Sequence, residues 1–213
     1  MISCICVDFD NTLGHFTHGS RDFFNIFLQR KIPRETLEKV YKETACALGF
    51  SFPHFVNFLA DAVGGIPNRE NLGIEFEEWL QRELTVYPDS IPACTLWQRH
   101  HIPVCIITAG EEQYQKHKVA LLHIPHDDVI VVQHVNEKAP ATKKLLKRYG
   151  RRIVFIDDKE SELDQLCDAG IGTDDVLKVH INRPDSPYGD QKSRYEHLEI
   201  ESLLDPNLAT ALE

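Results

Sequence analysis

The sequence contains no apolar run that approaches the ~18 residues of a membrane-spanning helix. No basic segment precedes the first carboxylates, Asp8 and Asp10, so we expect no secretory signal. Basic residues are in the minority, because 23 Lys and Arg stand against 33 Asp and Glu among 213 residues, a net charge of −10. An acidic surface argues against nucleic acids and anionic membranes as partners. We therefore expect a cytoplasmic protein that binds neither nucleic acid nor a membrane.

Zinc-binding patterns are also absent. The cysteines include no Cys-x-x-Cys pair, and none of the 11 histidines has a Cys or acidic partner at a recognised zinc spacing. We expect the histidines in surface loops. The even number of cysteines allows disulfides, but without a secretory signal we favour reduced, buried thiols. The cysteines are Cys4, Cys6, Cys46, Cys94, Cys105 and Cys167.

No internal repeat or low-complexity tract is present, yet the composition changes along the chain. Residues 15–88 hold nine of the 11 phenylalanines but only eight Val and Ile. Residues 101–181 hold 18 Val and Ile and one Phe. Since β-branched residues favour strands, this division predicts a β-rich core with a separate helical insert.

Short apolar runs bounded by turns or charges predict five β-strands. Four of the runs are almost continuously apolar, as in parallel strands that are buried on both faces. Helical patterns separate the last four strands, and they include a Pro near one helix start and Gly at two helix ends. This alternation predicts an α/β fold with a Rossmann-like, doubly wound parallel sheet. The predicted strands are residues 2–9, 103–108, 129–133, 152–156 and 176–181, and the helices are 111–122, 140–149 and 160–169.

More than 90 residues separate the first two predicted strands, too many for one crossover. Apolar side chains recur there with helical spacing, which predicts a small bundle above the strand ends. The predicted helices are residues 20–30, 33–48, 52–63 and 74–84, and a fifth at 91–99 leads back to the sheet. The expected organisation is a core domain of residues 1–14 and 89–213 and a helical insert of residues 15–88.

Chemically useful side chains follow several predicted strands. Asp8 and Asp10 end the first strand, Thr108-Ala109 end the second, and Asp157-Asp158 end the fourth. Taken alone, the Asp-Asn-Thr sequence also suits a turn or a helix cap. Because parallel strands place their carboxyl ends at one edge of the sheet, we expect these residues and Lys138 to lie together. Carboxylates suit Mg²⁺, and hydroxyl and ammonium groups suit phosphoryl oxygens.

Four motifs together resemble the haloacid dehalogenase-like hydrolase superfamily. They are DFDNTL, the Thr of IITAG, Lys138 before a Pro-started helix, and IDD, in the order and spacing of the superfamily over roughly residues 1–182. The resemblance implies a Rossmann-like core in which the helical insert is a cap over the active site. Two departures are Ile156, where many members have Gly, and the position of a further acid, which is Glu162 if counted from Asp158 but is replaced by Ser161 if counted from Asp157.

The resemblance implies a role for each motif residue. Asp8 would be the nucleophile that forms an aspartyl-phosphate, and Asp10 would be the general acid and base. Thr108, Ala109 and Lys138 would bind the phosphoryl group, with Lys143 and Lys144 as rivals that we expect on the solvent side of the helix.

The metal site implied by the resemblance holds Mg²⁺. Its ligands would be the carboxylate of Asp8, the backbone carbonyl of Asp10 and the carboxylate of Asp157. Asp158 would be an indirect partner, although the motif leaves open which of Asp157 and Asp158 binds directly.

The function implied by these motifs is a Mg²⁺-dependent phosphatase that acts on a small phosphorylated metabolite. Asp10 favours phosphate esters, because superfamily members that cleave carbon–halogen bonds lack this second Asp. Two alternatives remain: a phosphomutase on the same scaffold, and a catalytically weak binding or regulatory protein. The sequence does not distinguish a monomer from a homodimer.

The resemblance also predicts how the insert is attached. Gly14 and residues 15–18 would be a mobile link, and residues 87–88 the return. We expect His15 and His18 to be solvated rather than in contact with substrate. Residues 196–204 suit a short strand or a docking helix, and residues 205–213 are expected to fray.

Overall fold

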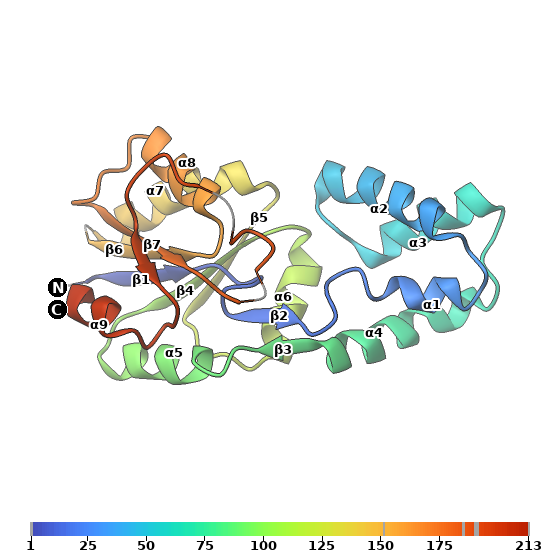
Figure 1. Cartoon of the computed structure of the whole chain (residues 1–213), viewed down its shortest axis with the longest axis horizontal. Helices are drawn as coiled ribbons and strands as arrows, with labels where there is room; N and C mark the ends of the chain where they lie inside the picture. Colours follow the sequence, from blue (N-terminus) through green and yellow to red (C-terminus); the bar gives the residue numbers. More distant parts are fainter. Residues whose placement is uncertain (1, 151, 185, 190–191, 213) are drawn as a thin grey trace.

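The computed structural model describes residues 2–150, 152–184, 186–189 and 192–212, without the side chains of residues 46–48. Its centre is a six-stranded parallel sheet in the order β5-β4-β1-β6-β7-β8 (Figure 1). The predicted Rossmann-like α/β fold is confirmed, and residues 196–204 contribute the sixth strand. The strands are β1 Cys4–Val7, β4 Val104–Ala109, β5 Asp128–Val132, β6 Ile153–Asp157, β7 Val176–Ile181 and β8 Leu198–Ile200.

Helices cover both faces of this sheet. Because side chains alternate along a strand, Ile5 and Val7 of β1 join one apolar cluster, while Cys4 and Cys6 join another. The first cluster includes residues of α5 and α6, and the second includes residues of α7 and α8. Burial on both faces explains why the strand sequences are almost continuously apolar. These helices are α5 Ser90–Arg99, α6 Glu112–Leu121, α7 Lys138–Tyr149 and α8 Glu160–Asp168.

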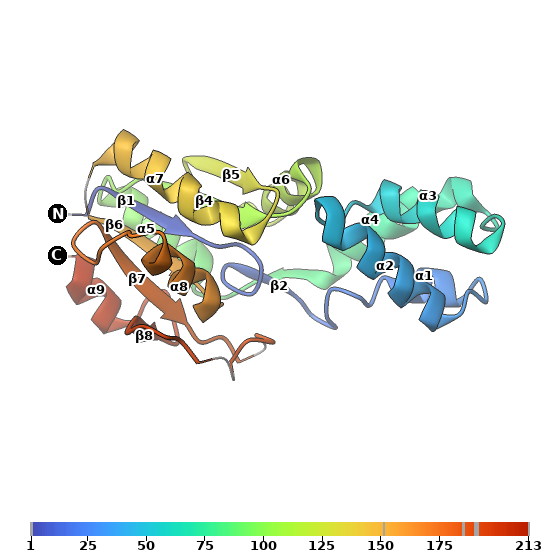
Figure 2. The same ribbon diagram turned by 90° about the horizontal axis from the view of Figure 1, so that it is seen from above.

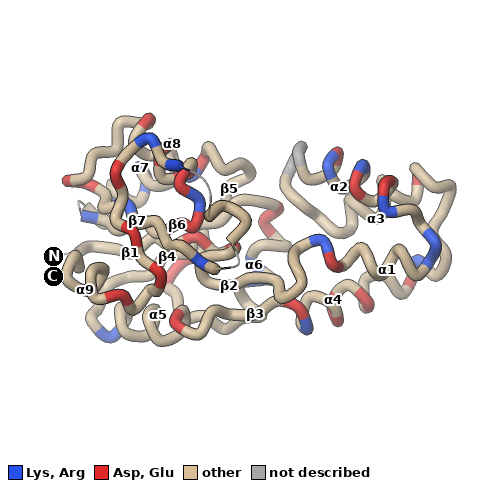
Figure 3. Tube along the Cα trace, in the orientation of Figure 1, with Lys and Arg blue, Asp and Glu red and all other residues tan. Residues whose placement is uncertain are grey.

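A separate group of helices lies beyond one end of the sheet, on the side away from both chain termini (Figures 1 and 2). Three of the four follow the predicted bounds within two residues, but the first is shorter than residues 20–30 because residues 20–23 form turns. Basic and acidic residues alternate along α2, which therefore carries no stripe of one charge (Figure 3). The helices are α1 Phe24–Leu28, α2 Arg34–Leu48, α3 Phe52–Val63 and α4 Leu72–Glu83, with a 3₁₀ turn η1 at Arg69–Asn71.

The phenylalanines of the insert pack around Phe23. Its ring lies 5.4 Å from that of Phe55 and 5.7 Å from that of Phe76, both edge-on, measured between ring centroids. Phe52 and Phe76 stack at 3.8 Å. Edge-to-face and stacked rings add to the apolar area that these side chains bury. This cluster is continuous with the apolar cluster on one face of the sheet.

The link between sheet and insert is a paired ribbon rather than the free segment that we expected. Strand β2, Gly14–Phe16, is antiparallel to β3, Leu84–Val86. A Cβ atom at Gly14 would lie 2.5 Å from Leu122 Cδ1 and 3.2 Å from the carbonyl oxygen of Thr85, so a larger residue at this crossing would have to displace the Leu122 side chain.

The carboxyl end of the chain also differs from expectation. Residues 205–213 were expected to fray, but α9, Pro206–Leu212, packs against the sheet layer through Leu208, which is buried. The cause is a small apolar contact made by Leu208 and Leu212, two leucines one turn apart that are too few to predict a docked helix from the sequence. Within the described chain, no helix is long and apolar enough to cross a membrane.

The cysteines follow the prediction where the structure describes them. Cys4, Cys6, Cys94 and Cys105 are free and buried, and Cys167 is free and half-buried. The side chain of Cys46 lies outside the described residues. Burial raises the pKa of the Cys94 thiol to about 12, so this thiol stays protonated at neutral pH.

The packing around Phe23 generates a stability prediction. Replacing Phe23 by Ala leaves a cavity among the eight aromatic rings that it contacts in the described part of the chain, and such truncations cost about 3–5 kcal/mol. We expect Phe23→Ala to lower the free energy of unfolding by that amount in urea titrations followed by circular dichroism. Phe58→Ala is the matched control, because Phe58 is 56% exposed and its loss costs little. Equal midpoints for the two variants would contradict this account of the insert.

Candidate active site

Three carboxylates meet at the carboxyl edge of the sheet. Asp8 follows β1, Asp157 ends β6, and Asp158 comes next in the chain. Strands β1 and β6 are neighbours in the sheet. The Asp8 N–H donates to the carbonyl oxygen of Ile156 at 2.9 Å, which holds the carboxyl ends of these two strands together. One oxygen from each carboxylate lies within 4.8 Å of the others, and all three residues are buried. This group can hold a metal ion.

Lys138 lies among these carboxylates. It is the first residue of α7, is 3% exposed, and its Nζ donates to Asp8 Oδ1 at 2.6 Å and to Asp157 Oδ2 at 2.8 Å. It also contacts the carboxylate of Glu162, which comes from α8. The rival lysines, Lys143 and Lys144, are exposed on the same helix.

Burial controls the proton affinities of this cluster. It raises the pKa of Asp8 to about 7, against the opposing effect of the Lys138 ammonium. It also raises the pKa of Asp158 to about 6 and that of Asp157 well above the ordinary range. For Lys138, burial favours the neutral form, but the surrounding carboxylates outweigh it and raise the pKa well above its usual value. The buried carboxylates therefore exceed the buried positive charge, which is the condition that favours a bound divalent cation.

Both Asp157 and Asp158 face this cluster, so the structure does not separate them as ligands. Asp157 Oδ1 accepts the Lys159 backbone N–H at 2.9 Å. Asp158 Oδ2 accepts the hydroxyl of Ser186 at 2.6 Å. Glu162, which the motif comparison named only as an acid of uncertain register, belongs to the same buried network.

The loop after β1 is held by residues from distant parts of the chain. The Thr12 hydroxyl accepts the Asp158 N–H at 3.1 Å, and the Thr12 carbonyl accepts from the Arg183 guanidinium at 2.8 and 3.2 Å. Arg183 is buried and forms two hydrogen bonds of 2.9 Å with the carboxylate of Asp89. These bonds fix the loop that directly follows Asp10. Sequence reasoning missed Arg183, because nothing local to it indicates its partners.

Asp10 is held apart from the buried carboxylates by a second lysine. Its two carboxylate oxygens accept from Lys118 Nζ at 2.6 and 2.7 Å. Lys118 lies on α6, is 2% exposed, and its ammonium is 5.1–5.8 Å from the ring centroids of Phe9, Phe16 and Tyr114. Sequence analysis missed Lys118, although its helical spacing from Tyr114 and Leu122 places it on the apolar face of α6 and is a usable signal.

Thr108 and Ala109, at the end of β4, lie beside the cluster and are held by one glutamine. The buried Thr108 hydroxyl donates to Gln115 Oε1 at 3.3 Å, and the Ala109 carbonyl accepts from Gln115 Nε2 at 2.8 Å. Both residues border a cavity of about 160 Å³ that Asp8, Asp10 and Lys138 also line. All of the sequence-predicted site residues except Asp157 therefore line this cavity. Asp157 lies directly behind it and accepts a hydrogen bond from Lys138, which does line the cavity.

A larger cavity of about 500 Å³ opens next to the first, between the sheet and the insert. Asp10 and Ala109 border both cavities. The insert approaches the sheet closely here, because a Cβ atom at Gly49 would lie only 2.6 Å from Gly110 Cα. Residues that line the larger cavity include Phe16, Tyr41, Phe50, Tyr114, Lys118 and Tyr188.

The histidine predictions are partly wrong. His18 is exposed and pairs with Glu83 at 2.7 Å, as a solvated residue can. His15 instead is half-buried, borders the larger cavity, and lies 4.3 Å from the Tyr87 ring. His180 is buried at the end of β7 rather than in a surface loop. Strand pairing, which the sequence spacing of histidines does not report, accounts for this burial.

The sequence profile of the haloacid dehalogenase-like hydrolases matches residues 2–170. The chain belongs to the haloacid dehalogenase-like hydrolase family. Comparison with curated protein sequences gives no match.

Solved structures with the same fold include several enzymes of this family. A family hydrolase from Xanthomonas campestris is 16% identical with a TM-score of 0.66, covering 99% of this chain and 90% of its own. A defluorinating L-2-haloacid dehalogenase is 14% identical with a TM-score of 0.68, covering 100% and 96%. A protein described as a predicted phosphoglycolate phosphatase from Haemophilus somnus is 12% identical with a TM-score of 0.58, covering 98% of both chains. At such identities the likeness shows the fold alone.

The raised pKa of Asp8 generates a prediction about stability and pH. The folded protein holds this proton more tightly than the unfolded chain, whose carboxyl titrates near 3.8. Ionisation of Asp8 therefore weakens the fold as the pH rises from about 4 to about 7. In EDTA, we expect Asp8→Asn to lose less stability than the wild type between pH 5 and pH 8, and to melt several degrees higher at pH 8.

Thermal unfolding followed by circular dichroism at both pH values checks this expectation. Asp61→Asn is the control, because Asp61 is exposed on α3 and outside the cluster. The same loss of stability with pH in Asp8→Asn and in the wild type would contradict the buried, proton-holding state of Asp8.

Proposed function

We propose that this family member is a Mg²⁺-dependent phosphatase that hydrolyses a small phosphorylated metabolite. The observation that carries the proposal is that Asp8 and Asp10 border one cavity with Lys138 and Thr108. A carboxylate nucleophile, a second carboxylate for proton transfer, an ammonium and a hydroxyl are the groups that phosphoester hydrolysis needs. Carbon–halogen cleavage in this superfamily does without the second aspartate, so Asp10 favours phosphate chemistry.

The donor set of the buried cluster fits Mg²⁺, which prefers carboxylate and carbonyl oxygens. Asp8, Asp157 and the Asp10 carbonyl would hold the ion, with Asp158 beside them. When bound, Mg²⁺ supplies positive charge that offsets the repulsion between the carboxylates and the substrate phosphoryl oxygens. The Lys138 ammonium would neutralise a further part of the negative charge of the carboxylates, and its hydrogen bond would orient Asp8.

Asp8 would attack phosphorus, so that an O–P bond forms to its carboxylate while the bond from phosphorus to the leaving oxygen breaks. Asp10, once released from Lys118 Nζ and protonated, would donate its proton to that oxygen. Asp10 would then take a proton from a water molecule that attacks the phosphorus of the aspartyl-phosphate, which releases inorganic phosphate and restores Asp8. Thr108 would donate a hydrogen bond to a phosphoryl oxygen.

The larger cavity would hold the rest of the substrate. Its volume of about 500 Å³ is within the range of small-molecule sites. Aromatic side chains from both the insert and the sheet border it, so the insert would act as a cap that helps select the substrate. Free thiols at Cys4, Cys6 and Cys94 agree with a reducing compartment, and we propose the cytoplasm.

Hydrolysis of p-nitrophenyl phosphate tests the proposal. We expect turnover in Mg²⁺, its loss in EDTA, and a loss of at least about a thousandfold in Asp8→Asn, because the nucleophile is gone. Asp174→Asn, at an exposed carboxylate, is the control and keeps the wild-type rate. A panel of phosphorylated metabolites replaces the aryl ester if the cap excludes it. Chloride release from 2-chloropropionate, with no phosphate release from any ester, would contradict the proposal.

Asp10 generates a separate prediction. We expect Asp10→Asn to lower kcat by about 10²–10⁴-fold, the usual contribution of a general acid and base. Steady-state phosphate release at saturating substrate measures it. An unchanged kcat would remove Asp10 from both proton transfers.

A further inference from the structure

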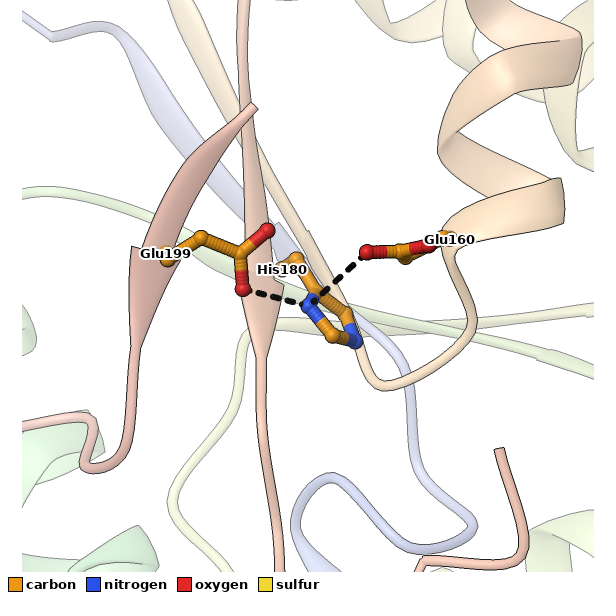
Figure 4. Close-up of side chains that lie close together, drawn as sticks. All are labelled: Glu160, His180 and Glu199. Carbon is orange, nitrogen blue, oxygen red and sulfur yellow. Dashed lines mark hydrogen bonds and ion pairs between the residues drawn. The ribbon is translucent and has the colours of Figure 1, made fainter. Parts of the chain in front are cut away.

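A second group of side chains that could hold a metal ion lies behind the candidate active site. His180 of β7, Glu199 of β8 and Glu160 at the start of α8 point toward one another (Figure 4). His180 and Glu199 are direct partners across the two strands. His180 Nδ1 is 2.6 Å from Glu199 Oε2 and 3.7 Å from Glu160 Oε1.

The protons of His180 can be assigned from its partners. Nε2 lies 3.1 Å from the backbone carbonyl oxygen of Asp158, and a carbonyl oxygen only accepts, so Nε2 carries a proton. In the neutral imidazole, Nδ1 then has a lone pair that faces two carboxylates. A proton on Nδ1 would make the 2.6 Å contact with Glu199 a hydrogen bond, and a metal ion bound to Nδ1 could take the place of that proton between the two carboxylates.

Burial favours positive charge between these side chains. The His180 side chain is 5% exposed and that of Glu160 is 12% exposed, so water screens their charges poorly. Glu160 Oε2 is also buried, and it has no hydrogen-bond partner among the residues that the structure describes. A buried carboxylate oxygen without a donor is costly, and a cation that Glu160 bound through both of its oxygens would remove that cost.

We propose that Glu160, His180 and Glu199 bind a divalent transition-metal ion of the Zn²⁺ class. A ring nitrogen with two carboxylates suits such an ion, whereas Mg²⁺ prefers oxygen ligands alone. Ligand atoms of one tetrahedral Zn²⁺ lie about 3.4 Å apart, close to the 3.7 Å between His180 and Glu160. The Glu199 carboxylate, now 2.6 Å from His180 Nδ1, would have to move slightly away from this nitrogen to admit the ion. Its side chain is exposed, so there is room for this movement.

The hydrogen bond from His180 Nε2 to the Asp158 carbonyl oxygen is a feature that this site shares with many metal centres. Histidine ligands commonly donate their other N–H to a carbonyl or carboxylate, which sets the ring orientation. Here that carbonyl belongs to the residue next to Asp157. The ion would connect β7, β8 and α8 directly behind the acidic pair, as a structural centre separate from the chemistry. The inference does not depend on the proposed phosphatase activity.

Zinc binding to the whole protein tests this inference. The protein is saturated with Mg²⁺ to occupy the oxygen-ligand cluster, Zn²⁺ is titrated by calorimetry, and bound zinc is counted after dialysis. His180→Asn and Glu199→Gln remove ligands. The matched controls are His117→Asn, which removes an exposed histidine paired with Glu77, and Asp157→Asn, which alters the other cluster.

We expect one zinc per chain in the wild type and in both controls. His180→Asn should lose it, and Glu199→Gln should bind at least about tenfold more weakly. Zinc should also raise the melting temperature of the wild type but not of His180→Asn, because only the folded wild type binds the ion. Because Glu199 lies at the surface, Glu199→Gln remains informative if His180→Asn does not fold.

Three results would overturn the inference: no zinc in the wild type, undiminished zinc in both ligand variants, or loss of zinc in Asp157→Asn with retention in Glu199→Gln. The first result would mean that Nδ1 carries a proton. The last would place the ion at the active-site carboxylates. All of these outcomes are read from zinc content, so they do not depend on whether the protein is a phosphatase.

Discussion

The contact of one buried ammonium with three carboxylates organises the functional edge of this protein. Asp8 follows β1, Asp157 ends β6 and Glu162 lies on α8, and each of them contacts Lys138. Without that ammonium, the strand ends would carry uncompensated negative charge in a buried setting. The ion pairs therefore fix the start of α7 against two neighbouring strands. The rest of the site, including the loop to Asp10, is placed relative to this group.

The sequence was sufficient for the parts of the fold that repeat a pattern. The bounds of α3 match residues 52–63 because an N-terminal Ser-Phe-Pro and a final Gly-Gly mark both ends. Strands β2 and β3 were missed because each has three residues, too few for an alternation to show. The α9 helix was missed because Leu208 and Leu212, two leucines one turn apart, are too short a pattern to predict a helix.

The site shows the same division between local and distant information. The position of Lys138 before a Pro-started helix indicated its place, and the helix phase excluded Lys143 and Lys144 by exposing them. Lys118 lies 108 residues after its partner Asp10, and Arg183 lies 94 residues after Asp89. Pairs at such separations are created by the packing of elements. A single sequence carries the charge of each residue but not the identity of its partner.

The antiparallel ribbon of β2 and β3 has a consequence for how such proteins can change. Every path from the sheet to the helices passes through six residues that are paired in register, Gly14 opposite Val86. A residue added to one strand of the ribbon would displace all four helices relative to the cavity, whereas a change between residues 17 and 83 leaves the crossing untouched. The ribbon therefore sets the orientation of the insert over the carboxylates, while the rings around Phe23 and the approach of Gly49 to Gly110 limit which sequences can fill it.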